Sequence, residues 1–461
     1  MGITVYTVRL SKLLLEIKEA LFQIQGLPCT ETLIRNLPKA DIHVHLPGTI
    51  SPQTAWHLGE RHGFLSWKHS CWGDSRFLSP HNPHKKYSEI FVNFEELRYD
   101  SHPDLRLLRY HIIPQDFSSF DRIMATVQGH RFPPGGIQTK EDISLILQAY
   151  LHHCLEDNIF YTEVQQNIRL AHTIYPHLPP HKARESFYQL LAHFQQLFSQ
   201  YGIILHFLNC FNKTQVSGLS TTSQERAIEA ALWLKETQES FPGLFVGLQS
   251  AGLESCPGAS PSLLSQGYYL AYEHGFGCEA HAGEGIGFQY LHDTLHELPV
   301  QRIAHGFQAI ENLSTIQAIK ESQITLVMSP VINLILGARI YHYHNKQKVG
   351  KTFIHNLDAH PIFHLFRDYG LNVALSSDNP HMGGVSLCTA MLLLAGIQPV
   401  NINPLSIQAA QASPLQLHEL ITLMIHAITS AFASEDIKLQ FLTRLKEFIS
   451  ELIVSSKFSL R

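Results

Sequence analysis

Four separated groups of polar residues in this chain carry side chains that bind metal ions. The first group reads Asp41-Ile42-His43-Val44-His45-Leu46. The other three read His281-Ala282-Gly283-Glu284, Arg302-Ile303-Ala304-His305-Gly306 and Ser376-Ser377-Asp378-Asn379-Pro380. Imidazole and carboxylate groups are the usual ligands of a catalytic zinc ion. Together the four groups predict a metal-dependent hydrolase.

The spacing of the first pair suits a β-strand. Side chains alternate between the two faces of a strand, so His43 and His45 project to the same side. The pair alone is weak evidence, because the chain holds 30 histidines and has a second pair, His342-Tyr343-His344. That second pair stands in the polar stretch 341–351 with no apolar run before it, and we expect it to lie in a solvated loop.

These residue types permit a hydrolytic site with one open metal position. His43, His45 and His281 supply imidazoles, and Asp378 can add a carboxylate. A bound metal lowers the pKa of water towards about 7. His305 could then orient or deprotonate the water, and Glu284, three residues after His281, could donate a proton to the substrate.

His305, Glu284 and Asp378 each also have a purely structural interpretation. His305 could be a hydrogen-bonded residue at a strand end. Glu284 could be a carboxylate favoured at a helix N-terminus, and Asp378 could form a turn before Asn379-Pro380. Each structural interpretation is plausible for one residue taken alone. It is much less probable that all four groups stand at successive strand ends by chance.

Short apolar runs that alternate with amphipathic helices must position these groups. The runs are 41–46, 159–164, 203–208, 244–248, 277–281, 302–305, 324–328 and 372–375. Helical stretches such as 184–200, 224–239, 261–275 and 309–321 separate most of them. Eight such units predict a (β/α)8 TIM barrel, whose active site lies at the carboxyl ends of its strands. A doubly wound sheet would produce the same alternation.

The composition describes a soluble globular protein that acts on small molecules. Hydrophobic residues make up 44%, charged residues 16%, and the net charge is -5, so nothing favours binding to nucleic acid or to an anionic membrane. The seven cysteines show no C-x-x-C spacing, which favours a reducing compartment. We expect a cytoplasmic protein without a signal peptide or membrane span, although export without a signal stays open.

The chain divides into three parts. We expect an N-terminal helical extension over 1–38, the barrel over 39–452 and a short tail over 453–461. An irregular stretch at about 57–115 is too long for an ordinary loop and is expected to be an insertion or a lid over the site. Two helices over 415–452, with Ser434 as an N-cap before the second, should pack on the barrel.

At these motifs the chain resembles the adenosine deaminase family of metal-dependent barrels. The resemblance runs from about Lys39 to Glu451 outside the insertion, with further matches at Tyr161-Thr162-Glu163-Val164, Val246-Gly247-Leu248, Ala251-Gly252 and His360-Pro361. It implies one Zn²⁺, although another divalent transition metal is possible. The ligands that it implies are His43, His45, His281 and Asp378.

The resemblance also implies roles in catalysis and substrate binding. Glu284 would protonate a 6-aminopurine at N1, while His305 and Asp378 would position the hydroxide that attacks C6, with loss of ammonia. The backbone of Gly252 would contact N3, and Asn379 occupies the position that contacts N7. Related binuclear enzymes have a modified lysine at the end of the fourth strand, where this chain reads Leu248-Gln249-Ser250, so a single metal is favoured.

Two departures from the family pattern bear on the substrate. Pro47 stands where many adenosine-specific members have an aspartate that accepts a hydrogen bond from the ribose. Asn379 stands where the family usually has a second aspartate. The interpretation we favour is hydrolytic deamination of an aminopurine nucleoside or related aminopurine. The alternatives are a purine- or partner-binding barrel with weakened catalysis and an amidohydrolase of a non-purine substrate; the sequence leaves the oligomeric state open.

Overall fold

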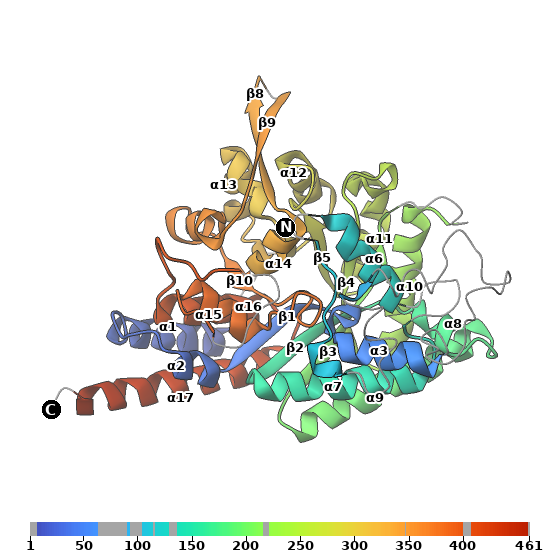
Figure 1. The fold of residues 1–461 in the computed structure, drawn as a ribbon, viewed down its shortest axis with the longest axis horizontal. Coiled ribbons are helices and arrows are strands. Elements are labelled where there is room, and N and C mark those ends of the chain that lie inside the picture. Colours follow the sequence, from blue (N-terminus) through green and yellow to red (C-terminus); the bar gives the residue numbers. More distant parts are fainter. Residues whose placement is uncertain are drawn as a thin grey trace.

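Eight parallel strands form the centre of the molecule (Figure 1). The computed structural model describes residues 7–62, 90–92, 104–113, 116–128, 136–214, 221–345, 347–399 and 407–459. The strands are β1 (Lys39–His45), β2 (Ile159–Gln166), β3 (Ile204–Asn212), β4 (Phe245–Ala251), β5 (Gly277–Ala282), β6 (Arg302–His305), β7 (Thr325–Met328) and β10 (Val373–Leu375). They correspond to the eight apolar runs of the sequence.

The strands close into a barrel. They follow one another in chain order from β1 to β7 and then β10, and each neighbouring pair is parallel. Closure comes from a parallel bridge between Val44 and Asp378, where the His45 N–H donates to the Asp378 carbonyl at 2.9 Å. This order excludes the doubly wound sheet and confirms the (β/α)8 barrel.

Helices surround the strands (Figure 1). Those between strands β1 and β10 are α3 (Pro52–Arg61), α6 (Phe117–Val127), α7 (Lys140–Glu156), α8 (Leu170–Ile174), α9 (Pro180–Gln200), α10 (Ser223–Ser240), α11 (Pro261–Glu273), α12 (Phe288–Glu297), α13 (Leu313–Glu321) and α14 (Pro330–Leu336). Local sequence sets their starts: Thr139 and Asp142 form a capping box at α7, and Thr222 and Glu225 form another at α10.

Short single-turn helices complete the connections. They are η1 (Leu46–Thr49), η4 (Leu105–Leu107), η5 (Pro257–Ala259), η6 (Phe307–Glu311), η7 (Leu357–Ala359) and the π-helical turn η8 (His364–Asp368). The first of them, η1, directly follows the two histidines of β1 and is fully buried. It therefore forms part of the end of the barrel at which the polar groups gather.

The terminal helices pack on the barrel and on each other. They are α1 (Val8–Gln23), α2 (Glu31–Asn36), α15 (Leu387–Leu394), α16 (Leu417–Ser430) and α17 (Glu435–Ser459). α16 packs against β1 and β10, and α1 packs against α17, where Glu16 and Lys446 form an ion pair of 2.7 Å. Among the described helices, none combines the length and the apolar character needed to cross a membrane.

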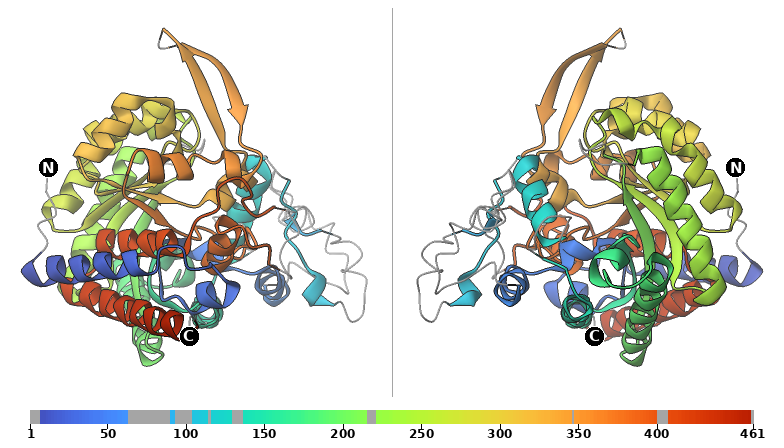
Figure 2. Two further views of the ribbon diagram at one scale, coloured as in Figure 1. Left: turned by 90° about the vertical axis from the view of Figure 1, so that its left-hand side faces the viewer. Right: turned by 90° about the vertical axis from the view of Figure 1, so that its right-hand side faces the viewer.

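A two-stranded hairpin corrects one expectation from the sequence. β8 (Arg339–His344) and β9 (Gln347–Phe353) pair antiparallel and project from the body of the barrel (Figure 2). The stretch 341–351, which includes His342 and His344, was expected to be a loop. β9 is exposed along almost its whole length and β8 is only half-buried, so the apolar alternation that marks a half-buried strand is weak in this hairpin. His342 instead contacts the Thr352 hydroxyl, at 2.7 Å.

The insertion is partly helical. Helix α3 continues to Arg61, so residues 57–61 are regular rather than irregular as expected. Of the remainder, 90–92 and 104–113 are described, while 63–89, 93–103 and 114–115 lie outside the described residues. The Tyr110 hydroxyl donates to the Ile50 carbonyl at 2.9 Å, which places this part of the insertion beside η1.

Candidate functional site

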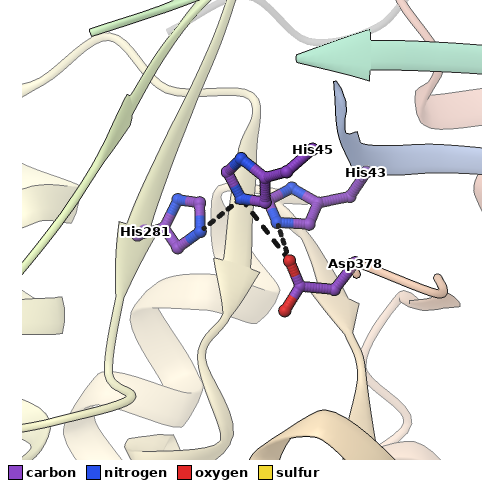
Figure 3. Close-up of side chains that lie close together, drawn as sticks. All are labelled: His43, His45, His281 and Asp378. Atoms are coloured by element: carbon purple, nitrogen blue, oxygen red, sulfur yellow. Dashed lines mark hydrogen bonds and ion pairs between the residues drawn. The ribbon is translucent and has the colours of Figure 1, made fainter. Parts of the chain in front are cut away.

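Four side chains with metal-binding atoms meet at the carboxyl ends of the strands (Figure 3). They are His43, His45, His281 and Asp378, all buried, and their ligand atoms all lie within 4.8 Å of one another. Nε2 of His45 is 3.3 Å from Nε2 of His281 and 3.4 Å from Oδ1 of Asp378. No other group of three or more such side chains comes together in the part of the chain that the structure describes.

Barrel closure brings these residues together. β5, which carries His281, lies four strands away from β1 in a ring of eight, so it faces His43 and His45 across the barrel. Asp378 follows β10, and its N–H donates to the His43 carbonyl at 3.0 Å. Its backbone has a φ of 60°, a left-handed conformation that costs a residue with a side chain about 1–3 kcal/mol. This turn keeps its carboxylate beside the two histidines.

The donor atoms fit a single divalent ion. Nε2 of His45 and Nε2 of His281 face each other at 3.3 Å, an arrangement in which both lone pairs could bind one cation. Nε2 of His43 is buried, has no hydrogen-bond partner among the described residues, and lies 3.6 Å from Oδ1 of Asp378. The separations of 3.3, 3.4 and 3.6 Å between these donor atoms would suit ligands that share one zinc ion at bond lengths of about 2.1 Å. Three nitrogens and one oxygen are a normal zinc ligand set.

The protonation of three of these groups also suits metal binding. Burial, with the nearby histidines, lowers the pKa of His281, and burial lowers that of His45 to about 4. Burial alone would raise the pKa of Asp378, but His43, His45 and His305 hold it at about 2. At neutral pH these three side chains therefore offer lone pairs rather than protons.

Groups on other strands hold the Nδ1 atoms of His281 and His43: Ser250 on the adjacent strand β4, and Glu279 on β5 across the barrel. Nδ1 of His281 donates to the Ser250 carbonyl at 3.0 Å, and Nδ1 of His43 lies 2.6 Å from Oε1 of Glu279. The Gln165 amide donates to the same carboxylate oxygen at 3.0 Å. With its proton on Nδ1, the neutral His281 ring keeps Nε2 free for a metal. Burial alone would lower the pKa of His43, but Glu279 and Asp378 raise it to about 10, so His43 loses its Nε2 proton when a metal binds.

Glu279 also belongs to a chain of buried charges. Its second oxygen lies 2.7 Å from Nε of Arg302, whose Nη2 lies 2.6 Å from Glu163. The other oxygen of Glu163 accepts the Tyr161 hydroxyl and the Phe432 N–H, both at 2.7 Å. Glu279 was missed from sequence, although a glutamate inside an otherwise apolar strand signals a buried partner.

Glu284 and His305 lie next to each other beside the four-residue cluster. Oε2 of Glu284 is 3.5 Å from Nε2 of His305, and the His305 ring lies 5.0 Å from that of His281. Burial, together with the charges of Asp378 and Glu254, raises the pKa of Glu284 to about 8. Burial lowers the pKa of His305 to about 3. At neutral pH the carboxyl is thus largely protonated and the imidazole neutral.

The loop that carries Glu284 is held by a second carboxylate. Glu254 accepts hydrogen bonds from the backbone N–H groups of Glu284, Gly285 and Ile286, at 3.1, 3.0 and 3.0 Å. Successive N–H groups of this kind form a concave anion-binding surface, and here the anion is a side chain of the protein. Sequence analysis did not find Glu254, because its partners are backbone atoms 30 or more residues away.

The two expected substrate residues lie at the same end of the barrel. Gly252 has a φ of 106°, and a Cβ there would lie 2.3 Å from Oδ1 of Asn212, so this position requires glycine. Nδ2 of Asn379 donates to Oδ1 of Asp378 at 2.7 Å. Oδ1 of Asn379 is buried, with no hydrogen-bond partner among the described residues.

Comparison of this chain with known proteins finds matches described as adenosine or adenine deaminases. A family model described as adenosine deaminase matches residues 131–448. An adenine deaminase from Psychrobacter cryohalolentis is 25% identical over 423 residues, covering 90% of this chain and 99% of the relative. An adenosine deaminase from Clostridium acetobutylicum is 25% identical, covering 89% and 98%. The crystal structure of an adenine deaminase from Arthrobacter aurescens matches with a TM-score of 0.60 and 20% identity, over 90% of this chain and 99% of that one.

Proposed function

This chain belongs to the adenosine deaminase family, and on that basis we propose that it hydrolyses the exocyclic C–N bond of a 6-aminopurine and releases ammonia. One observation carries the proposal: three imidazoles and a carboxylate converge beside the carboxyl group of Glu284, whose pKa is raised by burial. A metal cluster alone would suit many hydrolases. The proton donor next to it suits the activation of a ring nitrogen.

The metal is proposed to be one zinc ion. His43, His45, His281 and Asp378 would hold it, since their donor atoms are those that zinc prefers. A bound ion of this kind lowers the pKa of water towards about 7 and so supplies a nucleophile at neutral pH. Iron, nickel or manganese can bind the same donor types, so elemental analysis of the purified protein decides the identity.

The protein's own groups are proposed to act as follows. Glu284 donates its proton to a ring nitrogen of the purine, which makes the neighbouring carbon more electrophilic. His305 lies beside that carboxyl and orients the oxygen nucleophile together with Asp378. Gly252 and Asn379 contact the purine, as the family resemblance implies.

We place free adenine ahead of adenosine as the substrate. Pro47 lies in η1, directly after the histidine pair, and offers no side-chain group to hydrogen-bond a ribose hydroxyl. Curated relatives over nearly the whole chain include proteins named adenine deaminase, which supports the same choice.

We also propose a division of the chain into domains, which its packing supports. We propose that residues 39–452 form the catalytic domain, while 1–38 are a structural extension, since α1 packs on α17. The insertion at about 57–115 is proposed to cover part of the site. The contact between Tyr110 and Ile50 supports this, because Ile50 follows the β1 histidines by only five residues.

A substrate panel tests the proposal. Zinc-loaded protein is incubated with adenine, adenosine, AMP and N6-methylated analogues, and ammonia release is followed beside metal quantification. We expect turnover of at least one aminopurine, with adenine preferred. If metal-replete protein releases no ammonia from any of these compounds, the proposal is contradicted. Tight purine binding without turnover would identify a barrel that has kept substrate binding but lost catalysis.

A further inference from the structure

A buried asparagine touches both groups assigned to proton transfer and orientation. Asn333, on α14 just after β7, is 0% exposed. Its Nδ2 lies 3.1 Å from Nδ1 of His305 and 3.4 Å from Oε1 of Glu284. Its Oδ1 lies 3.3 Å from Nε2 of His360, which is also fully buried. No sequence motif had marked Asn333 as a functional residue.

These contacts determine which atoms carry protons. The backbone N–H of Ile362 donates to Nδ1 of His360 at 3.1 Å, so that nitrogen is an acceptor. Burial keeps His360 neutral by lowering its pKa to about 3, so its proton is on Nε2. Nε2 of His360 therefore donates to Oδ1 of Asn333, and the amide nitrogen of Asn333 donates to Nδ1 of His305.

The opposite orientation of the amide is unfavourable at the contact with His360. If oxygen and nitrogen were exchanged, the Asn333 amide nitrogen would face the N–H of His360, which places two donors together. A buried polar group without a partner costs about 1–3 kcal/mol, so the observed orientation is strongly preferred.

The chain of hydrogen bonds assigns a tautomer to His305. Since Nδ1 accepts from Asn333, the proton of the neutral ring is on Nε2, the nitrogen that faces Oε2 of Glu284 at 3.5 Å. We propose that Asn333, held by His360, is a positioning residue that sets His305 as a hydrogen-bond donor towards the reacting oxygen and orients Glu284. His305 in this state holds an oxygen atom but does not accept a proton at Nε2.

The role of Asn333 in catalysis rests on the proposed function. The tautomer of His305 can be tested without catalysis. Ring nitrogens of ¹⁵N-histidine-labelled protein are observed by long-range ¹H–¹⁵N NMR, before and after zinc loading. The His305 signals are identified by their loss in His305→Gln. We expect a protonated Nε2 and an unprotonated Nδ1 in the wild-type protein. A proton on Nδ1 would overturn the inference and leave the deaminase proposal standing.

An isosteric variant supplies the second test. In Asn333→Asp the carboxylate accepts from both histidines, so the proton of His305 should move to Nδ1. We expect kcat on the substrate found in the panel to fall about 10²- to 10⁴-fold, with little change in KM, as when a catalytic imidazole is held in the wrong tautomer. An unmoved proton or a near-normal kcat in the folded variant would overturn the inference.

A matched control separates positioning from general damage to the site. Gln308→Glu makes the same amide-to-carboxyl change at another fully buried residue, which accepts the Gly287 N–H at 2.7 Å and has no contact with His305 or Glu284. The tautomer of His305 should not change in this control. If it shifts as in Asn333→Asp, the effect is not specific to Asn333; if Asn333→Asp fails to fold, the wild-type spectrum still decides.

Discussion

Replacement of Glu279 by glutamine should weaken metal binding by the site without removing any of its ligands. Oε1 of Glu279 is 2.6 Å from Nδ1 of His43, and both side chains are fully buried. The carboxylate fixes the proton on Nδ1 and leaves Nε2 free. In Glu279→Gln this preference is lost, and the Gln165 amide, also in contact with Nδ1, can donate to it instead. Nε2 would then carry the proton and point it at the metal position.

The expected loss of metal affinity follows from the hydrogen bond that Glu279→Gln removes. A hydrogen bond to a charged group contributes about 1.5–3 kcal/mol. At about 1.36 kcal/mol per tenfold change, this corresponds to a weakening of metal affinity by about one to two orders of magnitude. The range agrees with the 10- to 100-fold loss typical when the hydrogen-bond partner of a metal-bound histidine is removed.

Competition with a chromogenic chelator measures the zinc dissociation constant of each protein. Glu163→Gln is the matched control, because Glu163 pairs with the same Arg302 but does not contact His43. Both variants disturb a buried ion pair and should lower the melting temperature, while only Glu279→Gln should lose zinc affinity. Equal zinc affinity in Glu279→Gln and wild type would refute the reasoning, as would an equal loss in Glu163→Gln.

Four further results are expected. Glu284→Gln should lower the rate of ammonia release at least about 10²-fold with little change in melting temperature, and near-normal turnover would exclude Glu284 as the acid. Because Glu284 acts while protonated and its pKa is raised to about 8, kcat should fall as the pH rises through that value; a rate that stays level well above it contradicts this assignment. Removal of metal by a chelator should lower the melting temperature, and added zinc should restore it, since a ligand that binds only the folded state stabilises it; identical melting curves would exclude a bound metal. Gly252→Ala should destabilise the protein by at least about 1 kcal/mol, because the left-handed backbone and the Asn212 side chain both oppose a Cβ there; unchanged thermal unfolding would contradict the geometry.

Two errors in the sequence interpretation have the same physical origin. Residues 341–351 form most of a hairpin rather than a loop, and residues 57–61 complete a helix. The hairpin projects from the barrel (Figure 2), with β9 exposed along almost its whole length and β8 only half-buried. Patterns of apolar residues reveal elements that bury one face, and they carry little information about an element that buries neither.

The sequence by itself determined the eight strands of the barrel and the residues that could bind a metal. Each strand is a short apolar run with its own neighbours, so local pattern was sufficient, and all parallel strands of a barrel present their carboxyl ends at one mouth. The presence of His43, His45, His281 and Asp378 near a common point followed from that topology.

Only the tertiary structure decided which groups hold these side chains in place. Glu279 meets His43 from a strand 236 residues later, and Asn333 meets His305 from a helix after the next strand. Such partners depend on the register between strands and on the rotamers of buried side chains, which no local sequence pattern encodes. The proton positions of His43 and His305 are therefore a property of the folded barrel, because they are set by hydrogen bonds between residues that only barrel closure brings into contact.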